Sequence, residues 1–449
     1  MSLSASLRAL LSESAVLEGE AIGAAAASDM SYTGATPPAM LIRPRTVSQL
    51  AEAMNLCHAA GVPVIAQGGM TGLAGGANPA GGEIAVSLAL LRGVEEVDTA
   101  SATMVVKAGT PLEECQKAAA DHGLFLALDL GSRGSCQIGG NLSTNAGGIR
   151  VIRYGMAREQ VLGLEAVLAD GTIVSSMNRM LKNNAGYDLK HLFIGSEGTL
   201  GIITRAVLRL HPPPGDITTM LCAVSTYEHA VTLLRRSQSQ LGGVVAFEAM
   251  WQDYFAFNAD ALKLAFFDIT HPFSIILESN APREAVEAFL AACLEDGLIS
   301  DALIATSHAQ AREMWSVREG HPIEALPNLL NFDVSLPIGR IGDYSEACTS
   351  ALKARWPEAY VSFYGHVGDS NVHICVSTLY GPGEDMHSVD EIVYGVLSHY
   401  HGSISAEHGV GTLKRPYLHL SRAPEELALM RRLKQALDPK GILNPGKVI

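Results

Sequence analysis

Three glycine-rich segments in the first half of the chain constrain its fold more than any other feature. They read QGGMTGLAGG at 67–76, GSRGSCQIGGNLSTNAGG at 131–148 and GSEGTLG at 195–201, and we expect each to form a loop or turn after a strand. Glycine lets backbone N–H groups approach a phosphate without interference from a Cβ atom. One such segment is as compatible with a tight turn as with a ligand. Three together, each containing Ser or Thr, indicate an extended ligand that carries a pyrophosphate.

None of the three segments fits a common nucleotide-binding motif. A dinucleotide fingerprint reads G-x-G-x-x-G between a strand and a helix, with an acidic residue about 20 positions later. A P-loop reads G-x-x-x-x-G-K-[ST]. Neither pattern occurs in these segments. The sequence therefore argues against a Rossmann or P-loop site.

Helix and strand signals surround the glycine-rich segments. Thr46–Gln49 is a capping box before an apolar helical stripe that ends at Gly61. Thr110–Glu113 is a second capping box, with Pro111 at the first helical position, and this helix ends near Gly123. We expect strands at 62–66, 104–108, 124–130 and 202–210, and a hairpin of 164–168 with 172–175 across Asp170-Gly171.

The segment His211–Gly215, which reads HPPPG, is the strongest candidate for a domain boundary because consecutive prolines stiffen the chain. Beyond it we expect strands such as 274–278 and helices such as 282–294 and 425–437. The sequence predicts domains at 1–212 and 213–404, followed by a C-terminal segment at 405–449.

Composition excludes several functional classes. The chain has 449 residues, of which 48% are hydrophobic and 17% charged, so it can bury more than one core. A net charge of −14 argues against nucleic acid as a partner. No apolar run reaches the roughly 20 residues of a membrane span, and residues 1–27 lack the pattern of a secretory signal. The seven Cys form no C-x-x-C pair, which is typical of a reduced, cytoplasmic protein.

A second group of residues is suited to metal binding and catalysis. GHVGDSNVH at 365–373 supplies His366 and His373, and Glu407-His408 follows later in the chain. Two His and one carboxylate are a usual ligand set for a catalytic metal that keeps a position open, and the fourth group is then free to move a proton. A turn at 368–371 between two strands would let the His rings converge. From these residues alone, water activation by a zinc hydrolase is equally compatible.

The motifs together resemble a known flavoprotein family. QGGMTGLAGG (67–76), IGGNLSTNAGG (138–148) and GSEGTLGIIT (195–204) resemble the FAD-binding motifs of the vanillyl-alcohol oxidase/PCMH superfamily. GHVGDSNVH, SAEHGVG (405–411) and LDPKGILNPGK (437–447) resemble its D-2-hydroxy-acid dehydrogenase branch. The resemblance implies an α+β fold. It has a PCMH-type FAD-binding domain of two α+β subdomains, an α+β substrate (cap) domain with a large antiparallel sheet that carries the metal site, and a C-terminal segment that returns to the FAD.

The resemblance also implies which residues hold the cofactor. Some members attach flavin covalently to a His in the first glycine-rich segment, and 67–76 contain no His, so we expect non-covalent FAD. By the resemblance, Gly198, Ile202 and Ile203 lie on the adenine and ribose side of the FAD, and Asn444 touches the isoalloxazine. The remaining residues implied to bind FAD are Gly68, Gly69, Thr71, Gly72, Leu73, Ser132, Gly139, Gly140, Thr144, Asn145, Gly147 and Gly148.

By the same resemblance, His366, His373 and Glu407 bind a divalent metal, zinc or another such as manganese, and His408 is the general base. The implied reaction oxidises a D-2-hydroxy acid to the 2-oxo acid. The metal holds the α-hydroxyl, His408 removes its proton, and the α-hydrogen passes as hydride to FAD.

Three further residues bear on the substrate. Arg318 matches the family's carboxylate-binding arginine, although a helix-surface Arg paired with Glu is the alternative. Asn331 stands where the hydroxyglutarate enzymes carry Lys, and Cys375 where they carry Asn. Both departures remove polar contacts, so D-lactate, D-malate or a more apolar acid stands beside D-2-hydroxyglutarate as the expected substrate.

Several alternatives stay open at this point. An oxygen-using 2-hydroxy-acid oxidase, a non-redox FAD transferase of the same superfamily and a non-catalytic flavoprotein subunit share these motifs. The electron acceptor would be a quinone, an electron-transfer flavoprotein or a cytochrome. A homodimer is left open.

Overall fold

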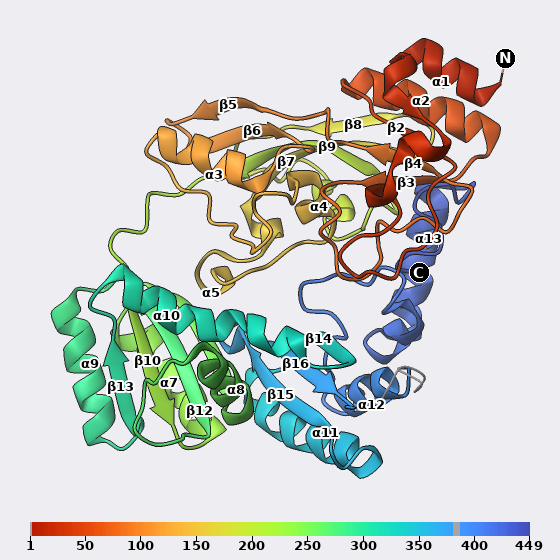
Figure 1. Ribbon diagram of the computed structural model, residues 1–449. Helices are drawn as coiled ribbons and strands as arrows, with labels where there is room; N and C mark the ends of the chain where they lie inside the picture. The colour runs from red at the N-terminus through yellow and green to blue at the C-terminus, as the bar shows by residue number, and fades with distance from the viewer. Residues whose placement is uncertain (1, 380–386) are drawn as a thin grey trace. The chain divides into compact units, whose positions relative to one another are not determined.

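The computed structural model describes residues 2–379 and 387–449, and the chain forms two compact units (Figure 1). Unit 1 comprises Met1–Gly148, Tyr154–Pro213 and Glu407–Ile449. Unit 2 comprises Ile149–Arg153 and Pro214–Ala406. The domain limits expected from the sequence at 212 and 404 stay predictions.

Unit 1 contains two sheets. The first has four strands in the order β1-β2-β4-β3, in which β4 pairs in parallel with β2 and with β3. Its strands are β1 (Val16–Leu17), β2 (Met40–Ile42), β3 (Val64–Gln67) and β4 (Ile84–Ser87). The second sheet is antiparallel with the order β5-β6-β9-β7-β8. Its strands are β5 (Val94–Asp98), β6 (Thr103–Lys107), β7 (Val161–Val167), β8 (Ile173–Ser176) and β9 (Ile202–Arg209).

One continuous apolar core joins both sheets of unit 1 to its helices. Met54 from a helix, Ile84 from the first sheet and Met104 from the second are all buried in it, as is Leu443 from the C-terminal segment. The C-terminal 43 residues of the chain therefore belong to this core, although they follow unit 2 in the sequence. The helices are α1 (Leu3–Leu11), α2 (Val47–Ala60), α3 (Leu112–Asp121), α4 (Ile138–Ser143), α6 (Lys190–Phe193) and α13 (Pro424–Leu437), and α5 (Val151–Tyr154) belongs in part to each unit.

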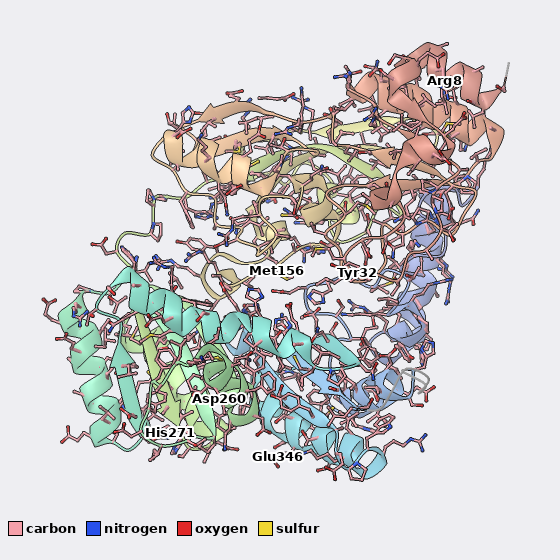
Figure 2. All side chains as sticks on the ribbon, viewed as in Figure 1. Arg8, Tyr32, Met156, Asp260, His271 and Glu346 are labelled. Atoms are coloured by element: carbon pink, nitrogen blue, oxygen red, sulfur yellow. The ribbon has the colours of Figure 1, made fainter. Side chains whose placement is uncertain are left out.

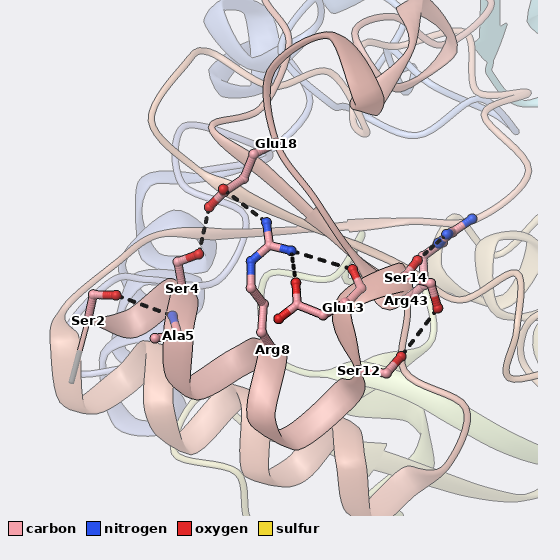
Figure 3. Close-up of polar contacts among 9 residues, drawn as sticks. All are labelled: Ser2, Ser4, Ala5, Arg8, Ser12, Glu13, Ser14, Glu18 and Arg43. Carbon is pink, nitrogen blue, oxygen red and sulfur yellow. Dashed lines mark hydrogen bonds and ion pairs between the residues drawn. The ribbon is translucent and has the colours of Figure 1, made fainter.

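Polar contacts at the N-terminus tie α1 to the segment that follows it (Figure 3). Arg8 bonds to Glu13 at 2.7 Å and to Glu18 at 3.0 Å, and Ser4 donates to Glu18 at 2.7 Å. Ion pairs between exposed side chains contribute little to stability, because water and salt screen their charges. The fully buried Leu7 packs in the unit 1 core, so burial of apolar surface stabilises the position of α1 more than these ion pairs do.

Unit 2 is built on one seven-stranded antiparallel sheet with the order β13-β10-β12-β11-β15-β16-β14. The large antiparallel sheet expected from the resemblance is confirmed. Its strands are β10 (Thr218–Val224), β11 (Val244–Trp251), β12 (Phe273–Ser279), β13 (Asp301–Ile304), β14 (Leu329–Ser335), β15 (Tyr360–Gly365) and β16 (Asn371–Ser377). Its helices are α7 (Tyr227–Gln240), α8 (Gln252–Leu262), α9 (Arg283–Glu295), α10 (His308–Glu319), α11 (Ile341–Arg355) and α12 (His387–Ser398).

Several elements expected from local signals are confirmed. The Thr46 hydroxyl accepts a hydrogen bond from the Gln49 N–H at 3.1 Å, and Gly61 ends α2 in the left-handed conformation. Strands β7 and β8 form the predicted hairpin. Strands β15 and β16 flank a short turn at Val367–Asp369, as the glycines and polar residues there predicted.

Three local predictions are wrong. Pro111 is the N-cap of α3 rather than its first residue, because the Thr110 hydroxyl bonds to Gly93 N and Lys107 O instead of capping the helix. Residues 124–130 form only isolated bridges, with different partners at each end, so they make no strand ladder. Residues 138–143 form helix α4 rather than loop, because two adjacent glycines do not prevent helical dihedrals.

All seven cysteines are free and buried, in agreement with the expected reduced thiols. Among the described residues, no helix has both the length and the apolar character needed to cross a membrane.

Candidate functional site

The three glycine-rich segments line one cavity of about 430 Å³ in unit 1. A cavity of this size lies in the usual range for small-molecule and cofactor sites. The lining contains most of the residues that the resemblance assigned to FAD: Gly68, Gly69, Thr71, Gly72, Leu73, Ser132, Gly139, Gly140, Thr144, Gly147, Gly198, Ile202, Ile203 and Asn444. The tertiary structure thus brings together segments that are more than 370 positions apart in the sequence.

Two predicted FAD residues lie outside the cavity lining. Asn145 accepts a hydrogen bond from the Arg158 N–H at 2.9 Å, and its amide donates to the sulfur of Met156 at 3.5 Å. Met156 is labelled in Figure 2. Gly148 donates its N–H to Glu407 Oε1 at 2.8 Å. These bonds give both residues a role in holding the protein together, and their contact with FAD stays a prediction.

The residues that line the cavity suit a flavin dinucleotide in their chemistry. A Cβ atom added to Gly140 would meet no other heavy atom within 4 Å, so the glycine leaves space that a side chain would fill. Leu88, Ile202 and Ile203 supply apolar walls for a ring system. The glycine-rich backbone and the hydroxyls of Thr71 and Ser132 supply polar groups for a ribityl chain and a pyrophosphate.

Glu407 and His408 line this same cavity, in unit 1. The Glu407 carboxylate accepts the Gly148 N–H, and a Cβ atom at Gly147 would lie 2.6 Å from it, so any larger residue at 147 would force the carboxylate to move. The structure therefore places the predicted general base beside the predicted flavin cavity. It does so through contacts within unit 1 alone.

His366 and His373 lie at the turn between β15 and β16 in unit 2, and their ring centroids are 5.3 Å apart. The predicted convergence of these rings is confirmed. His373 has a ligand atom within 4.8 Å of one on His366 and of one on Asp333. Imidazole and carboxylate donors at this spacing suit a divalent metal such as zinc.

Glu248, which was not among the site residues predicted from the sequence, connects two of them. Glu248 Oε1 lies 2.7 Å from His366 Nδ1, and Glu248 Oε2 accepts the Arg318 Nε–H at 2.6 Å. Burial by itself would raise the pKa of Glu248, but the charges of His366 and Arg318 outweigh it and lower the pKa to about 2. A carboxylate at Nδ1 orients an imidazole so that Nε2 can bind a metal. One acid in the otherwise apolar strand Val244–Trp251 was the signal that could have identified it.

Arg318 is buried, so the alternative of a surface arginine is wrong. It lies in the last turn of α10, and its guanidinium stands 4.7 Å from the centroid of the Tyr364 ring. Tyr364 stacks in turn on Tyr254, with ring centroids 4.0 Å apart. A planar guanidinium fixed by a carboxylate and an aromatic face is well placed to recognise a second carboxylate.

Asn331 and Cys375 face each other across β14 and β16, and the Cys375 thiol donates to Asn331 Oδ1 at 3.2 Å. Two positions along, Asp333 pairs with His373 in the same register. Asp333, which the sequence analysis also missed, accepts the Ala406 N–H at 3.1 Å. Since Ala406 directly precedes Glu407, this bond fixes the end of unit 2 from which the predicted metal carboxylate follows.

Two family models match the chain. One described as "FAD binding domain" covers residues 38–176, and one described as "FAD linked oxidases, C-terminal domain" covers residues 213–448. The second spans more than half of the chain. The protein belongs to the FAD-linked oxidase family.

Relatives agree with this assignment. This chain is 39% identical to a D-2-hydroxyglutarate dehydrogenase of Xanthomonas citri pv. viticola, over 92% of this chain and 89% of the relative. It is 38% identical to the mitochondrial D-2-hydroxyglutarate dehydrogenase of Bos taurus, over 91% of this chain and 76% of the relative. The protein is therefore a FAD-linked oxidoreductase homologous to D-2-hydroxyglutarate dehydrogenases.

The fold agrees as well. The structure of 4-ethylphenol oxidase from Gulosibacter chungangensis matches with a TM-score of 0.76 and 17% identity, over 99% of this chain and 96% of that one. At this identity the likeness concerns the fold alone. The α+β, PCMH-type fold expected from the sequence is thereby confirmed.

Replacing Gly140 by Ala is expected to weaken FAD binding while leaving the fold intact. The added methyl group meets no other heavy atom within 4 Å, and Ala favours the helix over Gly by up to about 1 kcal/mol. It does, however, take space at the cavity. Overpacking costs about 1–3 kcal/mol, so we expect the FAD dissociation constant to rise about 5- to 150-fold. A titration of the apoprotein with FAD, followed by flavin fluorescence, measures this dissociation constant.

Gly395→Ala is the matched control for this variant. Gly395 lies in α12 of unit 2, and a Cβ atom there also meets nothing within 4 Å. The Gly395→Ala variant should gain the same helix stability as Gly140→Ala and bind FAD with the affinity of the wild type. Equal FAD affinities for Gly140→Ala and the wild type would exclude Gly140 from contact with the cofactor.

Proposed function

We propose that the protein oxidises a D-2-hydroxy acid to the corresponding 2-oxo acid, with non-covalently bound FAD as the hydride acceptor. The observation that carries the proposal is the buried connection from Arg318 through Glu248 to His366, with contacts of 2.6 and 2.7 Å. A 2-hydroxy acid has two polar groups on neighbouring carbons, a carboxylate and a hydroxyl. Glu248 holds a guanidinium suited to the first group next to an imidazole suited to a metal for the second.

The proposed metal ligands are His366, His373 and Glu407, with zinc or manganese as the ion. Support comes from the approach of the two imidazoles in unit 2 and from Glu248, which occupies the Nδ1 side of His366. Glu407 follows Ala406, whose N–H is bound next to His373 by Asp333. A divalent metal supplies a Lewis acid that lowers the pKa of a bound hydroxyl.

Each of the proposed site residues has a defined part in the reaction. The terminal nitrogens of Arg318 bind the substrate carboxylate, while its Nε–H stays bonded to Glu248. His408 accepts the hydroxyl proton, because a neutral imidazole is a suitable base near pH 7. FAD supplies the acceptor for the α-hydrogen and its electron pair. The proton and the hydride account for both hydrogens lost when the alcohol becomes a ketone.

The residues around the substrate tail favour a short or apolar acid. Asn331 and Cys375 bond to each other, so this part of the strand pair presents a neutral surface instead of a cation for a second carboxylate. The two relatives described above, both named D-2-hydroxyglutarate dehydrogenase, share 38% and 39% identity with the chain. We place D-lactate ahead of the two diacids, D-malate and D-2-hydroxyglutarate, as substrates. A quinone, an electron-transfer flavoprotein or a cytochrome is the proposed electron acceptor.

An anaerobic titration tests the proposal directly. D-lactate, D-malate or D-2-hydroxyglutarate should bleach the oxidised flavin absorbance of the metal-loaded enzyme, and the L enantiomers should leave it unchanged. Bleaching by no acid would contradict the proposal and favour a transferase or a non-catalytic subunit. In air, one equivalent of peroxide per turnover would instead identify an oxidase.

Replacing His408 by Ala is expected to leave FAD bound and to slow flavin reduction about 100- to 10,000-fold, the usual loss when a general base is removed. Stopped-flow absorbance in a single turnover measures this rate per bound flavin. His122→Ala is the control, since His122 is an exposed residue at the end of α3. An unchanged reduction rate in His408→Ala would exclude the proposed role.

The double substitution Asn331→Lys with Cys375→Asn is expected to shift specificity toward a diacid. A charged hydrogen bond contributes about 1.5–3 kcal/mol, so kcat/KM for D-2-hydroxyglutarate relative to D-lactate should rise about 10- to 100-fold. Asn331→Met matches Lys in length without its charge and should show no such gain. A ratio that stays constant in the double variant would place the substrate tail elsewhere.

Acid precipitation of the native protein tests how FAD is attached. Because residues 67–76 contain no His, the yellow colour should pass into the supernatant. Colour that stays in the washed pellet would show a covalent link.

A further inference from the structure

Glu197 is a buried carboxylate that the proposed reaction leaves without a role. We propose that Glu197 is a positioning residue, which holds the loop at 409–411 and thereby fixes His408 beside the flavin cavity. This inference rests on the proposed function for the role of His408 itself. The loop contacts that carry it lie within unit 1.

Both oxygens of Glu197 bind the backbone that follows His408. Oε1 accepts the Val410 N–H at 2.6 Å, and Oε2 accepts the Gly411 N–H at 2.9 Å. Hydrogen bonds to an ionised carboxylate are roughly twice as strong as neutral ones. A Cβ atom at Gly409 would lie 2.8 Å from Oε1, so the loop can approach the carboxylate this closely only with glycine at that position.

The backbone of Glu197 is fixed to the wall of the cavity. Its N–H donates to Ser143 O at 2.9 Å, and its carbonyl oxygen accepts from Asn444 Nδ2 at 2.5 Å. Ser143, Asn444 and Glu197 itself all line the cavity. One residue therefore connects the cavity wall, through its main chain, to the loop after His408, through its side chain.

This arrangement is costly for the protein. Glu197 has a positive φ of 51°, which a residue other than glycine adopts at a cost of about 1–3 kcal/mol. Burial raises the pKa of its carboxyl, and only the two loop amides and the charges of Lys414 and Lys447 oppose that effect. Backbone strain and a buried carboxyl group with a raised pKa are typical of functional sites.

Accurate placement is what His408 needs from this anchor. A general base must lie within hydrogen-bond reach of the proton that it removes. A displacement of about 1 Å at a catalytic group can cost about 100-fold in rate. Loss of the anchor should therefore slow proton removal even when FAD stays bound.

Glu197→Gln tests the inference, because it keeps the size of the side chain but replaces one acceptor oxygen with an NH₂ group that cannot accept the second N–H. We expect flavin reduction per bound flavin to slow about 10- to 100-fold, through kcat more than KM. Reoxidation by an artificial dye should be unchanged. Hydrogen–deuterium exchange of the Val410 and Gly411 amides should become faster.

Two further variants separate positioning from general stability. Glu165→Gln neutralises another buried carboxylate of unit 1, which bonds to Thr204 at 3.0 Å away from the cavity, and should leave reduction per flavin unchanged. Glu197→Asp keeps the charge but shortens the reach, and its rate should lie between those of Glu197→Gln and the wild type. It also provides a foldable alternative if Glu197→Gln does not accumulate.

The outcomes are distinct. Wild-type reduction per flavin in both Glu197 variants would overturn the positioning role, even if their thermal stability falls. Unchanged amide exchange at 410 and 411 would overturn the anchoring itself. A wild-type enzyme that no D-2-hydroxy acid reduces would contradict the proposed function instead, and the exchange measurement would still decide whether Glu197 anchors the loop.

Discussion

The site in unit 2 depends on one buried carboxylate, Glu248, and on the guanidinium of Arg318 and the imidazole of His366 that it holds. An isolated carboxylate in the middle of a seven-stranded sheet would be strongly disfavoured, because the interior cannot solvate its charge. Arg318 and His366 resolve this by bonding one to each oxygen. Removing one partner of such a buried pair costs about 3–5 kcal/mol, so the three side chains hold one another in place. The same buried interaction therefore stabilises the fold of this unit and fixes the geometry of its site.

Unit 1 uses carboxylates in a different way, as acceptors for backbone N–H groups. Glu407 accepts from Gly148 and Glu197 accepts from two amides of the loop after His408. Glycine stands at the points of closest approach, Gly147 and Gly409, where a Cβ atom would clash with a carboxylate. The glycines around the cavity of this protein therefore have two physical roles: they leave space for the cofactor, and they make room for side chains that fix the loops around it.

Local signals in the sequence predicted elements well where one residue type decides the conformation. The Thr46 cap, the Gly61 terminus and the turn between β15 and β16 are such cases. The same reasoning failed at Thr110, whose hydroxyl bonds to Gly93 and Lys107 instead of capping the helix. It also failed at 124–130, because a strand needs a continuous partner and this segment has none along its length. The intrinsic propensity of a segment shows which conformations it can adopt, and its hydrogen-bonding partners in the folded protein decide which of them it does adopt.

The sequence by itself determined the chemical groups of this protein: three glycine-rich segments, two His on either side of one turn, and an adjacent Glu-His pair. These can be recognised because their spacing is local. Only the tertiary structure decided which groups share a contact. Glu248 lies 70 residues from Arg318 and 118 from His366, and Glu197 lies 213 from Val410. Contacts at such separations are set by strand order and register across a sheet and by the return of the chain to the first unit, and neither leaves a periodic trace in the sequence.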